Sequence, residues 1–395
     1  MNTFELKYQE AQRLQNLPVY IFAKLDELKA VQRAKGVDLI DLGMGNPDLP
    51  VHPTIIAKAQ DAITTAANCR YPDFSGLPAF RQAVSKWCKQ QYQIEVNPDN
   101  EVVPLIGSKE GVAHLIFALV NPGEVTLTPM PAYPAHFRAT ILAGGTPMAL
   151  PVDDNCQPLF EKISPGVLAK TKVIILSYPT NPTAHTATKE SFEKAVAFCK
   201  KHNKILISDF AYAEIYFEGQ KPNSMLSIPG AKDVCIEFHT CSKSFSMAGF
   251  RIGFAVGNPN LIASVSKIKT NLDYGLFMVN QHAAIAALSL TDTELDLTRA
   301  IYQERRDIML AGLKALGCKL EKPMATMYMW VPVPKGYTSS TFASKLIEES
   351  GVVVSPGTAF GDEGEGYIRL ALVEPKERIQ QALERLKKAG ISWAV

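Results

Sequence analysis

The strongest constraint on the fold is a series of three short apolar runs in the middle of the chain. They are residues 173–176 (VIIL), 204–207 (KILI) and 234–238 (VCIEF), and each has the length of a buried strand. Helical patterns separate them. The segment 188–202, for example, has an acidic side chain near its start and basic side chains at its end, as the helix macrodipole favours. Strands alternating with helices are typical of βαβ units, so the sequence predicts an α/β protein with a parallel sheet.

Polar side chains that could carry chemistry follow each of the three runs. The segments 178–183 (YPTNPT) and 208–212 (SDFAY) follow the first two, and Lys243 follows the third. In open α/β sheets, ligands bind outside the carboxyl ends of the strands. We therefore expect Asn181, Asp209 and Lys243 to meet in one crevice.

Lys243 lies in the segment 239–253 (HTCSKSFSMAGFRIG), whose spacing is the most informative in the chain. A neutral lysine amine can form an imine with a carbonyl cofactor. Arg251 adds a second cation, and the hydroxyls of Thr240 and Ser242 can donate to an anionic group. The alternative is a surface lysine followed by an edge strand, and the spaced K…G-x-R-x-G run disfavours it.

This segment resembles the lysine signature of class I aminotransferases, which hold pyridoxal phosphate (PLP). One departure is Thr240, where that family usually has serine. The resemblance to fold-type I PLP aminotransferases covers essentially the whole chain. It implies a large α/β PLP-binding domain, with a mostly parallel seven-stranded-type sheet flanked by helices, and a smaller α/β domain formed by the N-terminal arm and the C-terminal part.

The expected domain limits are 1–45 for the arm and part of the small domain, 46–285 for the PLP-binding domain and 286–395 for the small C-terminal domain. A long helical stretch, 288–317, would carry the chain into the second lobe. That lobe would contain strands at 328–331 and 367–370. It would close with an amphipathic helix.

The resemblance gives roles to the residues around the cofactor ring. Lys243 would hold PLP as a Schiff base. Asp209 would keep the pyridinium nitrogen protonated, and at about 4 Å with an effective dielectric near 20 that attraction is on the order of 4 kcal/mol. Asn181 and Tyr212 would hydrogen-bond the phenolate oxygen. For Asp209 alone, a solvated loop carboxylate is the alternative.

The phosphate would lie at a helix N-terminus that begins in the segment 107–111 (GSKEG). Ser108 and Lys109 match the family's phosphate turn, with Thr240, Ser242 and Arg251 as further cofactor contacts. Tyr133 occupies the position of the ring that stacks on the cofactor, although it could be a core tyrosine. Tyr71 resembles the tyrosine that reaches the phosphate of the neighbouring subunit, although it could be a turn residue.

The substrate α-carboxylate needs a planar fork of donors. Arg369 alternates with apolar residues on a predicted strand and matches the family's carboxylate-binding arginine, although alone it could be a solvent-facing strand residue. The backbone N–H of Gly45 would be the second contact, and Asn181 also belongs to this end of the site. Tyr20 and Tyr274 are candidates for the side-chain pocket, and both could be packing residues.

The motifs 17–22 (LPVYIF), 43–48 (GMGNPD), 271–275 (NLDYG) and 353–357 (VVSPG) resemble the branch that holds LL-diaminopimelate and alanine aminotransferases. The implied reaction is ping-pong transamination between an L-amino acid and a 2-oxo acid. Glutamate and 2-oxoglutarate would form one pair, with alanine, aspartate or LL-diaminopimelate as candidate donors. The alternatives are a PLP-dependent Cβ–Sγ lyase and a non-catalytic PLP-binding sensor.

Other classes lose support from the sequence. The dinucleotide fingerprint G-x-G-x-x-G fails at Asp48, and Walker A, HExxH and paired CxxC motifs do not occur, so we expect no metal. Among the seven histidines, which we take as mostly surface or structural residues, His239 adjoins the lysine segment. We also expect no DNA-binding domain before Leu17, which disfavours the sensor alternative.

Composition is consistent with a cytoplasmic homodimer that shares its active sites between subunits, as the resemblance implies. The chain has 395 residues, of which 47% are hydrophobic, enough for two lobes. Lys and Arg number 41 against 39 Asp and Glu, so no charge excess favours nucleic acid or membrane partners. Seven scattered cysteines indicate reduced thiols, and the first residues do not form a signal peptide.

Overall fold

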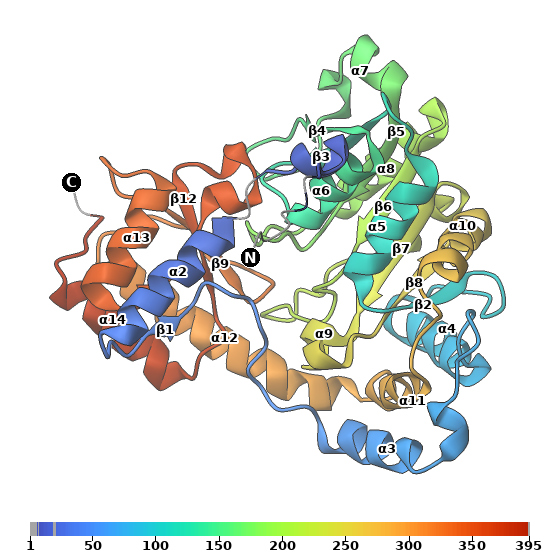
Figure 1. The fold of residues 1–395 in the computed structure, drawn as a ribbon, viewed down its shortest axis with the longest axis horizontal. Coiled ribbons are helices and arrows are strands. Elements are labelled where there is room, and N and C mark those ends of the chain that lie inside the picture. The colour runs from blue at the N-terminus through green and yellow to red at the C-terminus, as the bar shows by residue number, and fades with distance from the viewer. Residues whose placement is uncertain (1–5, 7, 19–20, 394–395) are drawn as a thin grey trace.

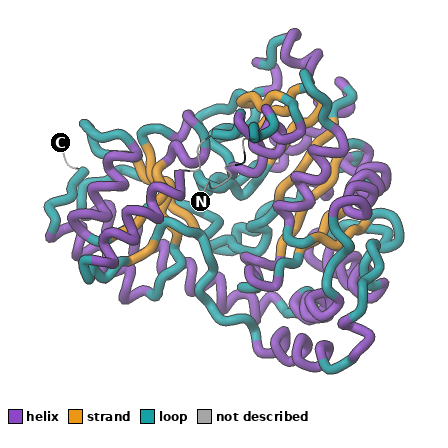
Figure 2. Tube along the Cα trace, viewed as in Figure 1, coloured by secondary structure: helices purple, strands orange, loops and turns teal. Residues whose placement is uncertain are grey.

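The computed structural model describes residues 6, 8–18 and 21–393, and it has two lobes (Figure 1). The strands gather in two separate groups, a large one and a small one (Figure 2). Two main hydrophobic cores of the large lobe lie on the two faces of the large sheet, and a third core fills the small lobe. This arrangement confirms the predicted α/β class.

The large sheet has seven strands in the order β2-β8-β7-β6-β5-β3-β4. β8 runs opposite to the other six strands, so the sheet is mostly parallel, as predicted. The strands are β2 (Val102–Leu105), β3 (Val125–Pro129), β4 (Thr146–Leu150), β5 (Thr171–Leu176), β6 (Ile205–Asp209), β7 (Cys235–Thr240) and β8 (Gly253–Gly257). The three apolar runs of the sequence form β5, β6 and β7, which are adjacent and parallel.

Helices cover both faces of this sheet because side chains alternate between the faces of a strand. In β5, Val173 and Ile175 pack on one side with α5 (Ser108–Leu119) and α10 (Pro259–Leu272). Ile174 and Leu176 pack on the other side with α4 (Pro78–Tyr92), α8 (Lys189–His202) and α11 (Met278–Ala287). Burying a side chain of this size contributes roughly 1.5–3 kcal/mol, so both layers stabilise the central strands.

The small lobe contains an antiparallel sheet, β11-β12-β9, and a parallel pair, β1-β10. Its strands are β1 (Ile40–Asp41), β9 (Tyr328–Pro332), β10 (Val352–Val353), β11 (Ser355–Pro356) and β12 (Tyr367–Ala371). Helices α13 (Ser339–Ser350) and α14 (Lys376–Lys388) pack against them. The remaining helices are α1 (Gln12–Gln15), α2 (Ile21–Ala34), α3 (Pro53–Ile63), α6 (Pro134–Ala143), α7 (Pro165–Lys170), α9 (Cys241–Ser244) and α12 (Asp292–Ala315).

The helix α12 joins the two lobes (Figure 1). It starts four residues later than the predicted stretch, because Thr291 and Glu294 form a capping box there. Three buried arginines of α12 bind carboxylates of other segments: Arg299 binds Glu214, Arg305 binds Asp48 and Arg306 binds Glu218. The segment after β6 lies within the predicted PLP-binding domain, 46–285, but it packs in the core of the small lobe. The predicted limits of the domains therefore remain predictions.

Among the described residues, no helix is both long and apolar enough to cross a membrane.

Candidate active site

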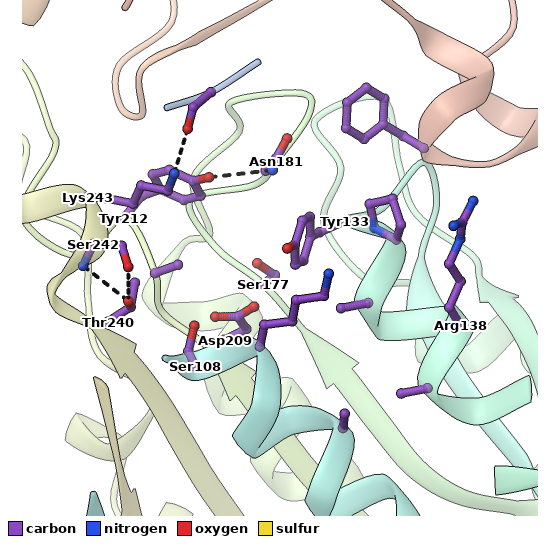
Figure 3. Close-up of a pocket in the computed structure, with 18 of the residues that line it drawn as sticks. Ser108, Tyr133, Arg138, Ser177, Asn181, Asp209, Tyr212, Thr240, Ser242 and Lys243 are labelled. Atoms are coloured by element: carbon purple, nitrogen blue, oxygen red, sulfur yellow. Dashed lines mark hydrogen bonds between the residues drawn. The ribbon is translucent and has the colours of Figure 1, made fainter. Parts of the chain in front are cut away.

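A cavity of about 450 Å³ lies at the carboxyl ends of β5, β6 and β7, between the large sheet and residues of the small lobe (Figure 3). Twelve of the predicted site residues line it. They are Gly45, Ser108, Lys109, Tyr133, Asn181, Asp209, Tyr212, Thr240, Ser242, Lys243, Arg251 and Arg369. The parallel strands therefore bring together the loop residues that follow them, as expected for such sheets.

Lys243 reaches the cavity from α9, the short helix that follows β7. Its Nζ donates a hydrogen bond of 2.6 Å to the backbone oxygen of Gly45 (Figure 3). The amine therefore lies beside the loop that was predicted to bind the substrate carboxylate. A ligand attached to Lys243 would stand between the two lobes.

Asp209 ends β6 and is buried at 6% exposure. Its Oδ2 lies 2.8 Å from His136 Nε2, and its buried Oδ1 has no hydrogen-bond partner within the described ranges. A buried carboxylate oxygen without a donor is costly, so this atom suits a ligand N–H. The pyridinium nitrogen of PLP is such a donor, and the site fits the cofactor on this point.

His136 was not predicted as a site residue. Among the histidines, only His239 was singled out, but that residue does not line the cavity. His239 is bonded to the buried Glu237 at 3.1 Å, whereas His136 is 1% exposed and holds Asp209. The sequence feature that could have identified His136 is its position on α6, three residues after Tyr133, which caps that helix.

Donors suited to an anion surround the N-terminus of α5, which begins at Ser108. The preceding Gly107 has a φ of +79°, and a Cβ there would lie 2.4 Å from Arg251 Nη2. On the facing segment, Thr240 Oγ1 donates to Ser242 Oγ at 2.9 Å. Hydroxyls, a guanidinium and free helix amides together make this end of the cavity suitable for a phosphate.

A buried cluster of charged side chains holds the helix α5 in place. Lys269 Nζ donates to Glu110 at 2.5 Å and to Asp273 at 3.0 Å, and His114 lies 3.2 Å from Glu110. Possible metal-ligand atoms of Glu110, His114 and Asp273 lie within 4.8 Å of one another. Because the Lys269 ammonium already sits between the two carboxylates, the cluster supports α5 as an ion-pair network.

Arg369 extends from β12 and is 4% exposed. Its Nη1 donates to Asn181 Oδ1 at 2.8 Å, its Nη2 donates to Gly43 O at 2.7 Å, and its buried Nε has no partner within the described ranges. The guanidinium lies 4.2 Å from the Tyr328 ring centroid and 4.6 Å from that of Phe360. An arginine has five N–H donors, so donors remain for a carboxylate.

Tyr328 is a second residue that sequence reasoning missed, since it was noted only as part of a strand. It accepts a 3.0 Å hydrogen bond from Tyr212, whose own hydroxyl accepts a 3.5 Å bond from Asn181 (Figure 3 shows the latter). Burial, followed by the neighbouring Tyr328, raises the pKa of Tyr212 well above its usual range. Burial alone would raise the pKa of Tyr328, but the charges of Lys243 and Arg369 and the bond from Tyr212 outweigh it and lower that pKa.

Two of the predicted residues that the structure describes are not in this cavity. Tyr71 and Tyr274 do not line it; they are 82% and 56% exposed, and their ring centroids lie 4.6 Å apart. Tyr20 lies outside the described residues. The cavity also has lining residues that were not predicted, namely Leu17, Met44, Ala113, Pro134, Ala135, Arg138, Ala139, Leu142, Ser177, Ala211, Ala248, Tyr328 and Phe360.

A mostly parallel sheet with a lysine, a carboxylate and an anion cradle at its strand ends defines a PLP-dependent enzyme of fold type I. A model of the family described as aminotransferase class I and II matches residues 37–386, and the chain belongs to this family. The family uses PLP and transfers amino groups between amino acids and 2-oxo acids. The predicted family, fold class, cofactor and general activity are thereby confirmed.

Individual relatives match along nearly the whole chain. The LL-diaminopimelate aminotransferase of Aquifex aeolicus (strain VF5) is 45% identical and covers 96% of this chain and 99% of its own length. LL-diaminopimelate aminotransferase 2 of Trichormus variabilis is 44% identical, with 98% and 100% covered. Substrate-bound BacF of Bacillus subtilis superposes with a TM-score of 0.94 at 35% identity, with 99% and 100% covered. A probable N-succinyldiaminopimelate aminotransferase of Thermus thermophilus gives 0.89 at 34%, with 93% and 100% covered.

Proposed function

We propose that Lys243 is the residue that carries the cofactor and moves the substrate α-proton. One observation carries this proposal: the Lys243 amine, the unpartnered Oδ1 of Asp209 and the Arg369 guanidinium all open onto one cavity. When bound, PLP supplies a carbonyl carbon for amine exchange and an electron sink for the α-carbon. The Lys243 amine, once free, is the base that can take up the α-proton and return it.

The other residues bind and orient. Asp209 Oδ1 would accept a hydrogen bond from the protonated ring nitrogen of the cofactor, while His136 holds the carboxylate through Oδ2. Asn181 and Tyr212 would donate hydrogen bonds to the ring oxygen of the bound cofactor, and the Tyr133 ring would stack on its face. These contacts hold a planar ring in one orientation, which is what directs proton transfer to a single carbon.

The anionic groups have separate sites at opposite ends of the cavity. Ser108, Lys109, Thr240, Ser242 and Arg251 bind the phosphate at the N-terminus of α5. Arg369 and the backbone N–H of Gly45, assisted by Asn181, bind the substrate α-carboxylate.

We further propose that glutamate and 2-oxoglutarate form one substrate pair and that LL-diaminopimelate is the other donor. The second statement is supported by the names of relatives that are 44–45% identical over nearly the full chain. Within the described residues, Asp209 is the one carboxylate that lines the cavity, and it is engaged by His136. The distal ammonium of LL-diaminopimelate would therefore need a counter-charge from a partner subunit. Alanine and aspartate have no distal ammonium, so they are the donors to compare with it.

The test combines a variant with a donor panel. Lys243→Ala should lose multiple-turnover transamination and the absorbance of lysine-bound PLP, whereas Lys109→Ala, a matched change in the same cavity, should keep that absorbance. Normal turnover by Lys243→Ala would refute the assignment. The panel pairs each candidate donor with 2-oxoglutarate. Release of pyruvate and a thiol from cystathionine would instead indicate a lyase, and cofactor binding without any turnover would indicate a sensor.

We also propose a homodimer with shared active sites. Support comes from an aromatic cluster in which Tyr71 and Tyr274 are exposed and Phe74 is half-buried. The centroid of the Tyr274 ring lies 4.6 Å from that of Tyr71 and 4.9 Å from that of Phe74. Exposed aromatic rings in contact are typical of surfaces that another chain covers. In an isologous dimer each cluster would approach the partner's cavity.

Subunit exchange tests the shared site. Lys243→Ala mixed with Tyr71→Glu should regain activity, because each hybrid has one doubly damaged site and one intact site. Tyr337→Glu, at another exposed tyrosine, is the control and should be active alone. No recovery in demonstrated hybrids would remove Tyr71 from the partner's site.

Two further expectations stay proposals. We propose a cytoplasmic location, consistent with seven free cysteines, which cell fractionation would test. We also propose the domain limits 1–45, 46–285 and 286–395, which limited proteolysis would test.

A further inference from the structure

Four residues at the substrate end of the cavity form a closed ring of contacts. Arg369 donates to Asn181 at 2.8 Å, Asn181 donates to Tyr212 at 3.5 Å, and Tyr212 donates to Tyr328 at 3.0 Å. The centroid of the Tyr328 aromatic ring lies 4.2 Å from the Arg369 guanidinium, and this contact closes the cycle. Tyr212 and Tyr328 are 4% and 2% exposed, so water does not compete strongly for these bonds.

The hydroxyls of Tyr212 and Tyr328 each carry one proton. In the structure, the Tyr212 hydroxyl donates a hydrogen bond to the Tyr328 oxygen, and no hydrogen bond donated by Tyr328 is found among the described residues. Tyr212 has one O–H, so it cannot donate to Tyr328 and to a ligand at the same time. When Tyr212 turns its proton toward a ligand oxygen, its own oxygen becomes free to accept the proton of Tyr328.

We infer that Tyr328 is a positioning residue that donates to Tyr212 while Tyr212 donates to the ring oxygen of the bound cofactor. Chains of hydrogen bonds strengthen one another, so the second tyrosine makes the first a stronger donor. The inference rests on the role of Lys243 proposed above, because the ring oxygen lies next to the lysine-bound carbon in PLP.

The charges around Tyr328 favour this direction of donation. Lys243 and Arg369 face it from α9 and β12, while Tyr212 and Tyr302 face it from the segment after β6 and from α12. Burial acts to raise the pKa of the Tyr328 hydroxyl, whereas the two cations act to lower it, as does the hydrogen bond that Tyr212 donates in this structure. A more acidic phenol is a stronger hydrogen-bond donor.

Gly45 shows how closely Tyr328 is held. A Cβ on Gly45 would lie 2.1 Å from the Tyr328 hydroxyl oxygen, so the hydroxyl rests on the backbone of this glycine. The hydroxyl is therefore confined between the Gly45 loop and Tyr212. Confinement of this kind keeps the donor aimed at Tyr212 without a loss of side-chain entropy at each turnover.

The test measures the absorbance of reconstituted holoenzyme against pH. Tyr328→Phe removes only the hydroxyl and keeps the ring under Arg369. The Tyr212 hydrogen bond to the ring oxygen becomes weaker, the oxygen becomes more basic, and the midpoint of the titration should rise. A neutral hydrogen bond corresponds to a rise of about 0.4–1 pH unit. The KM of the amino donor should change less than about twofold, since the carboxylate site keeps its packing.

Two comparisons make the result specific. Tyr302→Phe is the matched control: Tyr302 is fully buried in the same core, its hydroxyl has no hydrogen-bond partner within the described ranges, and its removal should leave the midpoint unchanged. The double variant Tyr212→Phe/Tyr328→Phe should titrate like Tyr212→Phe alone, because Tyr328 acts through Tyr212. Shifts that add would overturn the inference.

Other outcomes are equally decisive. An unchanged midpoint, or a higher KM without a shifted midpoint, overturns the inference, and a lower midpoint shows that Tyr328 competes for the Tyr212 proton. If Tyr328→Phe does not fold, 3-fluorotyrosine at position 328 offers a stronger donor and should lower the midpoint. Absence of lysine-bound absorbance in the unmodified protein would refute the role of Lys243 itself, which separates the two failures.

Discussion

Replacing Arg369 with leucine should remove carboxylate recognition while leaving the cofactor in place. The guanidinium is buried between two aromatic rings and uses two of its donors on Asn181 and Gly43. Arg369 lines the cavity, and its Nε has no hydrogen-bond partner within the described ranges. Leucine keeps part of the packing volume but donates no hydrogen bond.

The expected loss follows from two hydrogen bonds to a charged group. Each contributes roughly 1.5–3 kcal/mol, or about 3–6 kcal/mol for the pair. Since about 1.4 kcal/mol corresponds to tenfold, kcat/KM should fall on the order of 10²- to 10⁴-fold. The variant also leaves the buried acceptor Asn181 Oδ1 without its donor, at about 1–3 kcal/mol, so the melting temperature of the apoprotein should fall as well. Gly43 O keeps the hydrogen bond that Ser355 Oγ donates at 2.7 Å.

The assay compares steady-state kcat/KM for glutamate, 2-oxoglutarate and an amine donor that lacks the α-carboxylate. Arg369→Leu should affect the first two alike and the third very little, because only the first two present a carboxylate. Arg251→Leu is the matched change at the phosphate end and should mainly speed the loss of PLP on dialysis. An equal loss for donors with and without a carboxylate would refute the assignment of Arg369.

Two further predictions concern stability. Gly45→Ala should lower the melting temperature of the apoprotein, because a Cβ 2.1 Å from the Tyr328 hydroxyl overpacks the site by about 1–3 kcal/mol. Gly166→Ala is the control and should not lower it, because nothing lies within 4 Å of a Cβ there. Equal melting temperatures for the two variants would contradict this prediction. Arg306, through its hydrogen bond, lowers the pKa of Glu218 from the ordinary 4.5 to about 2. The contribution of that pair is therefore present above pH 4.5 and is lost as the pH falls toward 2. The difference in unfolding free energy between the wild type and Glu218→Gln should shrink over this window, and a constant difference would show that the pair does not titrate in it.

The sequence by itself determined the class of fold and the chemistry at one end of the site. The runs that form β5, β6 and β7 are mostly apolar because these strands are buried on both faces, and such runs can be read locally. Lys243, Ser242, Thr240 and Arg251 lie within one short segment. Their spacing carries the information, so no long-range contact was needed to group them.

Tertiary structure decided which distant side chains meet. His136 and Asp209 are 73 residues apart, and Tyr212 and Tyr328 are 116 apart. These contacts depend on strand register and on how the small lobe packs, since a shift of one residue turns a side chain to the opposite face. Tyr71 shows the same limit: its motif suggested a contact with the phosphate of the neighbouring subunit, and only the fold showed that its ring is exposed and does not line this chain's own cavity.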